Sequence, residues 1–166
     1  QEATPLYKGG LFHKIVENAS IKQRDEGEIE DKDTLIAQVA ESWDSTQYLS
    51  SSVKKENQDK KSLDHALDSY QKWTSTNPNT VLELEMRFST HIGGYKFNGV
   101  IDRVDQTPEG NYVLIDYKTG HSTPKQVPDS LQLNLYCMAI QEKFGKFPTL
   151  ASFFYVEEPE GGQWFH

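Results

Sequence analysis

The stretches "GVIDRVD" (residues 99–105) and "VLIDYKTG" (residues 113–120) decide the fold of this chain. Both have the β-branched, alternating composition that is typical of strands, and a turn containing proline and glycine separates them. If the two strands pair through that turn, Asp102 and Asp116 approach each other across the sheet, with Lys118 two residues beyond on the same face. The sequence therefore predicts two carboxylates and an ammonium at one place.

Such a carboxylate pair needs a cation or a shared proton, because burial and mutual repulsion both oppose its ionisation. A hard divalent ion is the natural partner, and an ammonium beside it favours phosphodiester hydrolysis. The alternative is a surface ion pair between Lys118 and one aspartate, with the other simply closing a strand. Arg103 and Asp105 fall on the opposite strand face from Asp102, so we expect them to be structural or to contact each other.

Composition and charge exclude several classes of protein. The chain has 166 residues with 36% hydrophobic content, which indicates one ordinary globular domain. No apolar run approaches the ~18 residues of a membrane span, and the start lacks the layout of a secretory signal. A net charge of −8 argues against a broad basic surface for nucleic acid. The single cysteine, Cys137, excludes an internal disulfide and a four-cysteine zinc or iron–sulfur site from this chain alone.

Helical periodicity dominates the first half and strand alternation the second. In the first half, we expect helices at 10–19, within 31–44 and at 62–74, with a mobile polar linker at 50–61. In the second half, we expect strands at 80–92, 94–106 and 110–120, a helix at 131–145, a strand at 148–158, and the start of another in 161–166. The predicted order is helices, an antiparallel meander of three strands, a helix and a strand.

With "QLNLY" (132–136) following the two strand motifs, the sequence resembles the PD-(D/E)XK nuclease superfamily, most closely its RecB-like branch. That branch includes nuclease domains attached to UvrD-type helicases. The resemblance implies an α/β fold with a restriction-endonuclease-like αβββαβ core, a mixed sheet flanked by helices, here with an N-terminal helical insertion. It also implies that Asp102 and Asp116 bind metal with the backbone carbonyl of Tyr117, and that Lys118 is catalytic.

Further motifs extend the resemblance. Gln132 and Tyr136 match a Q-x-x-x-Y pattern and share one helix face, where they would orient DNA or support Lys118. The alternative is that Tyr136 is a packing residue and Gln132 is merely exposed.

The same resemblance implies two more candidate metal ligands. "GGLFHKIVE" (9–17) matches a motif in which the histidine, here His13, is a metal ligand; otherwise it is a surface or capping residue. Glu85 occupies a position that is often acidic in the family and would reach the metal through water, unless it pairs with Arg87 or Arg103.

The leading hypothesis is a deoxyribonuclease that depends on Mg²⁺ or Mn²⁺ and has no iron–sulfur cluster from this chain. We expect one nuclease domain over 1–166, with a mostly helical part at 1–80 and the catalytic sheet and helix at 81–166, excised from a larger chain. The resemblance implies an exonuclease domain of a helicase–nuclease in DNA repair or recombination. Its expected partners are DNA and a helicase, in the same chain or separate, and its expected location is the cytoplasm, near a prokaryotic nucleoid, without a membrane.

Two alternatives belong to other classes. One is a catalytically silent module that binds DNA or protein on the nuclease fold. The other is a metal-dependent phosphatase or nucleotide hydrolase, which would need a pocket for a small phosphate ester.

Overall fold

A computed structural model describes residues 5–48, 52–120, 130–159 and 163–165. The chain divides into two compact units, each with a core of its own. The first unit comprises 1–77, 118–121 and 155–163, and the second comprises 78–117, 122–154 and 164–166.

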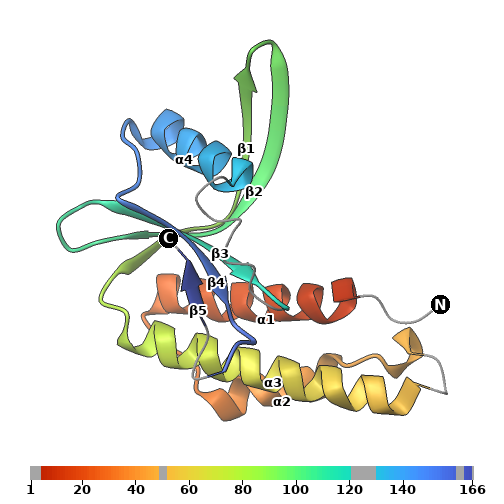
Figure 1. Ribbon diagram of the computed structural model, residues 1–166. Helices are drawn as coiled ribbons and strands as arrows, with labels where there is room; N and C mark the ends of the chain where they lie inside the picture. The colour runs from red at the N-terminus through yellow and green to blue at the C-terminus, as the bar shows by residue number, and fades with distance from the viewer. Residues whose placement is uncertain (1–4, 49–51, 121–129, 160–162, 166) are drawn as a thin grey trace. The chain divides into compact units, whose positions relative to one another are not determined.

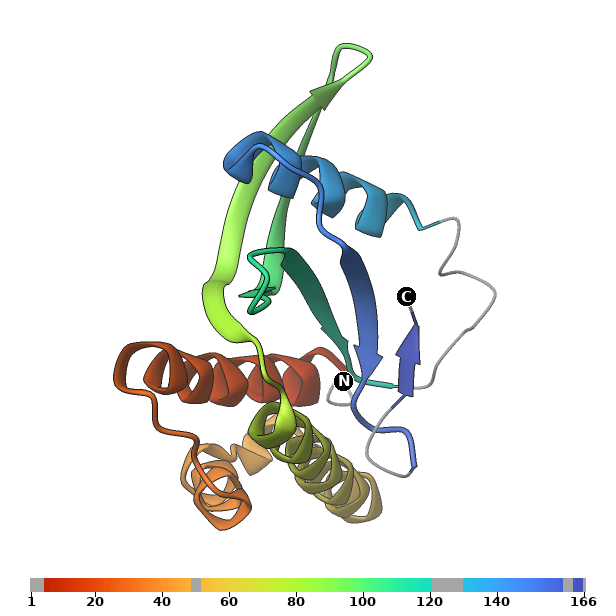
Figure 2. The ribbon, with the colours of Figure 1, turned by 90° about the vertical axis from the view of Figure 1, so that its left-hand side faces the viewer.

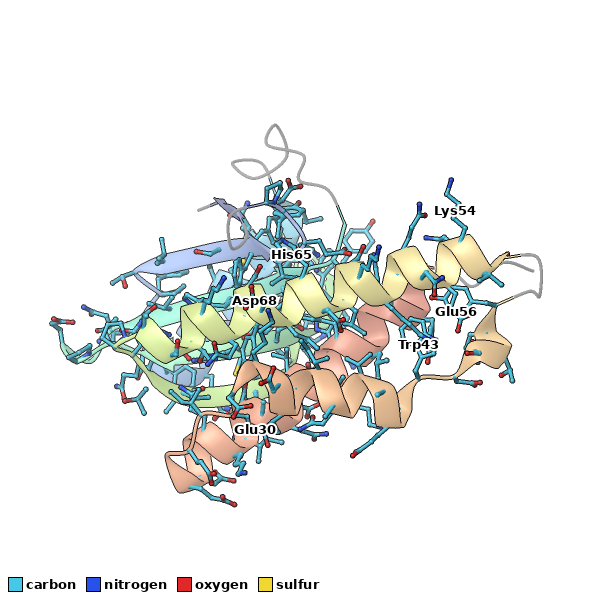
Figure 3. The ribbon with its side chains drawn as sticks, turned by 90° about the horizontal axis from the view of Figure 1, so that it is seen from below. Glu30, Trp43, Lys54, Glu56, His65 and Asp68 are labelled. Atoms are coloured by element: carbon cyan, nitrogen blue, oxygen red, sulfur yellow. The ribbon has the colours of Figure 1, made fainter. Side chains whose placement is uncertain are left out.

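The first unit is built on three helices that pack side by side (Figures 1 and 3). They are α1 (Pro5–Glu26), α2 (Lys32–Ser42) and α3 (Val53–Thr76), with a 3₁₀ turn, η1 (Ser45–Gln47), before α3. Apolar side chains at helical spacing form their common core: Phe12, Ile15, Val16, Ala19, Leu35, Val39, Leu63, Leu67 and Tyr70. None of the described helices is long and apolar enough to cross a membrane.

The prediction of a mobile linker at 50–61 is wrong. Residues 53–61 form the first turns of α3, and the first two residues of the expected linker lie outside the described ones. The polar residues stabilise the helix instead of interrupting it: Lys55 and Asp59 form an ion pair of 2.8 Å at i,i+4 spacing. Asp59 is buried and accepts a hydrogen bond of 2.6 Å from the Tyr48 hydroxyl. Composition alone does not distinguish such a helix from a solvated linker.

A five-stranded sheet and one helix make up the rest of the fold (Figure 2). The elements are β1 (Thr80–Ile92), β2 (Tyr95–Gln106), β3 (Tyr112–Lys118), α4 (Leu131–Phe144), β4 (Leu150–Tyr155) and β5 (Gln163–Phe165), and the sheet order is β1-β2-β3-β4-β5. The expected order of helices, three strands, helix and strand is confirmed. Gly93 and Gly94 close the β1–β2 hairpin with φ of +56° and +82°, a region that glycine adopts without strain.

The sheet is mixed, as expected for the superfamily core. The β1–β2 and β2–β3 pairs are antiparallel. At one end of β3, Tyr112 accepts from the Thr149 N–H at 2.9 Å, and at the other end Lys118 accepts from the Val156 N–H at 3.1 Å. Because both partners advance in the same direction, β4 runs parallel to β3.

The core of the second unit contains a fully buried ion pair. The Arg103 guanidinium donates to Asp105 at 2.7 and 3.2 Å, and neither side chain is exposed. The expected contact between these two residues is therefore confirmed. Helix α4 packs on β1 and β2; Ser130 caps its first turn by accepting from the Leu133 N–H at 3.2 Å. These contacts fix α4 against the strands that carry the acidic residues.

Candidate active site

Three acidic side chains lie at matching positions on three neighbouring strands. Glu85 on β1 lies opposite Asp102 on β2, because Leu84 pairs with Arg103 and Met86 pairs with Ile101. One step beyond the pair of Arg103 and Ile115, the β2–β3 ladder brings Asp116 opposite Asp102. One carboxylate oxygen of Glu85 lies within 4.8 Å of one of Asp102. Glu85, Asp102 and Asp116 are called the acidic cluster below.

The backbone at Glu85 is strained. Its φ of +46° is the only positive value at a non-glycine residue among the described part of the chain. A residue with a Cβ pays a steric cost of about 1 kcal/mol or more in this conformation. The strand also carries a register shift between Val81 and Glu83. The irregular backbone sits at the one position of β1 that faces Asp102, which is typical of a strand that aims a functional side chain.

The pKa of the Asp102 carboxyl lies far above its usual value. Burial is the largest cause, the charge of Asp116 the second, and Glu85 adds to it, so the pKa rises from 3.8 to about 9. A hydrogen bond of 2.8 Å from the Tyr117 N–H to Asp102 Oδ2 acts in the opposite direction. Asp116 is itself buried and shares a hydrogen bond with Asp102. Ionisation of Asp102 is therefore opposed by its burial and by the two neighbouring carboxyl groups.

Two residues of α4 adjoin this cluster. The Gln132 side-chain amide donates to the Tyr136 hydroxyl at 2.9 Å, so the two residues of the Q-x-x-x-Y pattern contact each other. Burial raises the pKa of the Tyr136 hydroxyl above its usual value, and the charges of Asp116 and Asp102 raise it further. The tyrosine is therefore a neutral donor whose electrostatic surroundings are set by the acidic cluster.

A glycine on β2 lets an aromatic ring support that tyrosine. Gly99 pairs with Phe88 across the β1–β2 ladder. A Cβ at Gly99 would lie 2.6 Å from two ring carbons of Phe88 and 3.5 Å from the Tyr136 ring. The Phe88 and Tyr136 rings meet edge to face with centroids 5.5 Å apart, a favourable geometry for aromatic pairs. Because Gly99 has no side chain, the Phe88 ring has room to pack beside it and against Tyr136.

Lys118 is the last residue of β3, and alternation along the strand places it on the same face as Asp116. The segment that follows is held within the first unit. The Gly120 N–H donates to the Glu157 carboxylate, which also forms an ion pair of 2.5 Å with Lys8 of α1. This arrangement restrains the chain immediately after Lys118.

His13 lies on α1, in the first unit. One turn earlier, Gly9 lies against the same segment, because a Cβ there would be 3.0 Å from Thr119 Oγ1. Residues 9 and 13 share a helix face, so His13 lies on the face of α1 that meets this segment. Its role as a metal ligand stays a prediction.

Sequence reasoning missed two supports of the site. The ion pair between Lys8 and Glu157 joins residues 149 positions apart, and no local pattern announces it. The Phe88–Gly99 contact had one usable signal, since a glycine inside a strand often marks close approach of a neighbouring group.

A model of the PD-(D/E)XK nuclease superfamily matches residues 1–163. The chain belongs to the PD-(D/E)XK nuclease superfamily. A search of curated proteins found no significant match. Nucleases of this superfamily typically use divalent metals, and membership implies DNA as the substrate. The predicted superfamily and fold are confirmed.

The acidic cluster fits a divalent cation. All three are carboxylic acids and offer oxygen ligands, which Mg²⁺ and Mn²⁺ prefer. Burial and the charges of Asp116 and Glu85 raise the pKa of Asp102, so ionisation of this carboxyl calls for compensation by a positive charge. A divalent cation would provide that compensation.

Proposed function

We propose that this chain is a deoxyribonuclease that hydrolyses DNA phosphodiester bonds with Mg²⁺ or Mn²⁺. The observation that carries the proposal is the acidic cluster, whose three carboxyl groups lie at matching positions on neighbouring strands and in which burial raises the pKa of Asp102. A divalent cation at this position would favour the ionised form of the Asp102 carboxyl. We assign Asp102, Asp116 and the backbone carbonyl of Tyr117 as ligands, with Glu85 contributing directly or through water.

We also assign His13 as a ligand. The support is its motif at 9–17 together with the superfamily match, since an imidazole is a good ligand for Mn²⁺ and a tolerable one for Mg²⁺. The assignment rests on the sequence pattern and is tested by the loss of metal affinity in His13→Ala.

The side chains have separate roles in the proposed reaction. A divalent metal held by these residues would supply Lewis-acid polarisation of the phosphodiester and activation of water. The Lys118 ammonium stabilises the charge that develops on the phosphoryl oxygens. Gln132 and Tyr136 orient the DNA backbone by hydrogen bonding, with the tyrosine held in its neutral, donating form.

The finer assignment is a RecB-like exonuclease domain of a helicase–nuclease that acts in DNA repair or recombination. It is supported by the order of four motifs along the chain, at 9–17, 99–105, 113–120 and 132–136. A helicase, in the same chain or as a partner, would deliver DNA to a protein whose net charge of −8 does not attract it. Such an enzyme would act in the cytoplasm at the nucleoid.

Cleavage of end-labelled single- and double-stranded DNA in Mn²⁺ and in Mg²⁺ tests this function. We expect products from the wild type that require metal, no products from Asp116→Asn or Lys118→Ala, and wild-type products from the control Lys72→Ala, which changes an exposed lysine of α3. Release of labelled mononucleotides from the start identifies an exonuclease, whereas internal fragments identify an endonuclease. A folded protein that cleaves in neither metal would contradict the proposal and favour a silent binding module.

A further inference from the structure

A hollow in the first unit is lined by lysines, and no residue of the acidic cluster lines it. Its volume is about 420 Å³, and Lys8, Lys55 and Lys61 line it together with Gln58 and Gly120. Gly120 follows Lys118 by two residues along the chain. All of these residues belong to the first unit. This feature is called the lysine hollow below.

The acidic groups of the lysine hollow are buried, whereas two of its cations are exposed. The Asp59 and Glu157 side chains are only 5% and 9% exposed, and the Lys55 side chain is 45% exposed. Lys61 is exposed at the rim. The Lys55 and Lys61 side chains are therefore more accessible from solvent than the two carboxylates.

Both carboxylates are already engaged by the protein. Asp59 accepts from Lys55 at 2.8 Å and from the Tyr48 hydroxyl at 2.6 Å. Glu157 binds Lys8 and the Gly120 N–H. With three lysines and two carboxylates, the hollow carries a net charge of +1 in a chain of −8.

The lysines of α3 extend this positive rim along the helix. Lys54 and Lys61 are seven residues apart and therefore lie on the same helix face. Figure 3 shows Lys54 projecting from the N-terminal end of α3. Lys60 faces elsewhere, with its ammonium 5.2 Å from the centre of the Trp43 ring. Lys54 and Lys61 thus form a short row of exposed cations along one face of α3.

We propose that the lysine hollow binds a backbone phosphate of the DNA strand that the enzyme cleaves. The inference deepens the proposed function and rests on it. Lysine ammoniums are the usual point-charge partners of phosphate, and the Gln58 amide can donate as well. Because Gly120 lines the hollow two residues after Lys118, a phosphate held there would position the DNA strand near the segment that follows Lys118.

Binding and cleavage measured on the full chain test the inference. Fluorescence anisotropy with labelled single-stranded DNA in chelator reports affinity without cleavage, at several salt concentrations. Single-turnover cleavage in Mn²⁺ over a range of enzyme concentrations separates half-saturation from the maximal rate. The variants are Lys61→Gln and Lys55→Gln, with Lys72→Gln as a control on the same helix and Lys55→Arg as the variant that keeps the charge.

We expect Lys61→Gln and Lys55→Gln each to weaken DNA affinity about threefold to tenfold at low salt. Each should also reduce the slope of log affinity against log salt by about 0.7, the value for one lost phosphate contact on a single strand. The maximal cleavage rate should not change, and both Lys72→Gln and Lys55→Arg should behave as the wild type. Unfolding midpoints measured in parallel verify that the variants are folded.

The outcomes distinguish this inference from the proposed function. If the wild type cleaves DNA and both glutamine variants match it in affinity and salt slope, the hollow is not a phosphate site and the nuclease assignment stands. If the wild type binds no DNA in chelator or in Mn²⁺, the inference is overturned. If inorganic phosphate displaces DNA when its concentration equals that of the DNA phosphates, the hollow is a general anion site and the inference is also overturned.

Discussion

Replacing Asp102 by Asn should remove the loss of stability that Asp102 causes as pH rises. The asparagine amide resembles the protonated carboxyl: its oxygen can accept from the Tyr117 N–H, which bonds Asp102 at 2.8 Å, and its NH₂ can donate to Asp116. The variant therefore keeps the contacts of the protonated cluster but has no proton to lose.

The magnitude follows from the raised pKa. In the unfolded chain Asp102 loses its proton near pH 3.8, and in the folded chain near pH 9. Between these values the folded state binds one more proton than the unfolded state, so its stability falls as pH rises. Each pH unit in this range costs the wild type somewhat more than 1 kcal/mol, which amounts to roughly 3 kcal/mol between pH 5 and pH 7. The asparagine variant lacks this contribution.

Urea unfolding of wild type and Asp102→Asn in chelator, at pH 5, 6 and 7, measures the difference. We expect the stability of the variant relative to that of the wild type to increase with each rise in pH. Glu41→Gln, which removes an exposed carboxylate from α2, should follow the wild-type slope. Parallel pH profiles for wild type and Asp102→Asn would refute the reasoning. Adding Mn²⁺ at a hundred times its dissociation constant should stabilise the wild type by about 2.7 kcal/mol and the variant by less.

Three further substitutions probe the supports of the site, each measured by urea unfolding. Gly99→Ala should destabilise the protein by about 1–3 kcal/mol, because the added methyl group would meet the Phe88 ring at 2.6 Å. Gly10→Ala, which lies in open space on α1, should stabilise the protein by about 0.5–1 kcal/mol. Equal effects of the two substitutions would contradict this reasoning. Arg103→Met should cost about 3–5 kcal/mol by leaving Asp105 buried without its cation, and an effect under 1 kcal/mol would be inconsistent. Glu85→Gly should relieve the strained φ of +46° and raise stability in chelator while weakening Mn²⁺ binding; unchanged metal affinity would exclude Glu85 as a contributor.

The fold was predictable where local patterns are strong. Alternation along 80–92 matches β1 at both ends, and the short turn after β2 fixes the register that places Asp102 opposite Asp116. Contacts between distant residues were not predictable in the same way. The polar first turns of α3 depend on a buried acceptor, Asp59, that composition does not reveal.

The candidate site shows the same division. The spacing of Gln132 and Tyr136 placed both on one helix face, and their hydrogen bond follows from that spacing. Glu85 was identified only by its position in the family pattern, because a positive φ inside a strand has no sequence signature in a glutamate.

Calorimetric titration of the full chain with Mn²⁺ at pH 7, in buffers of different ionisation enthalpy, tests the central claim most directly. We predict saturable binding with release of about one proton, since the Asp102 carboxyl is protonated at this pH without metal, and no saturable binding by Asp116→Asn. Binding without proton release would contradict the account of the acidic cluster. Absence of binding by the folded wild type would contradict the metal site itself.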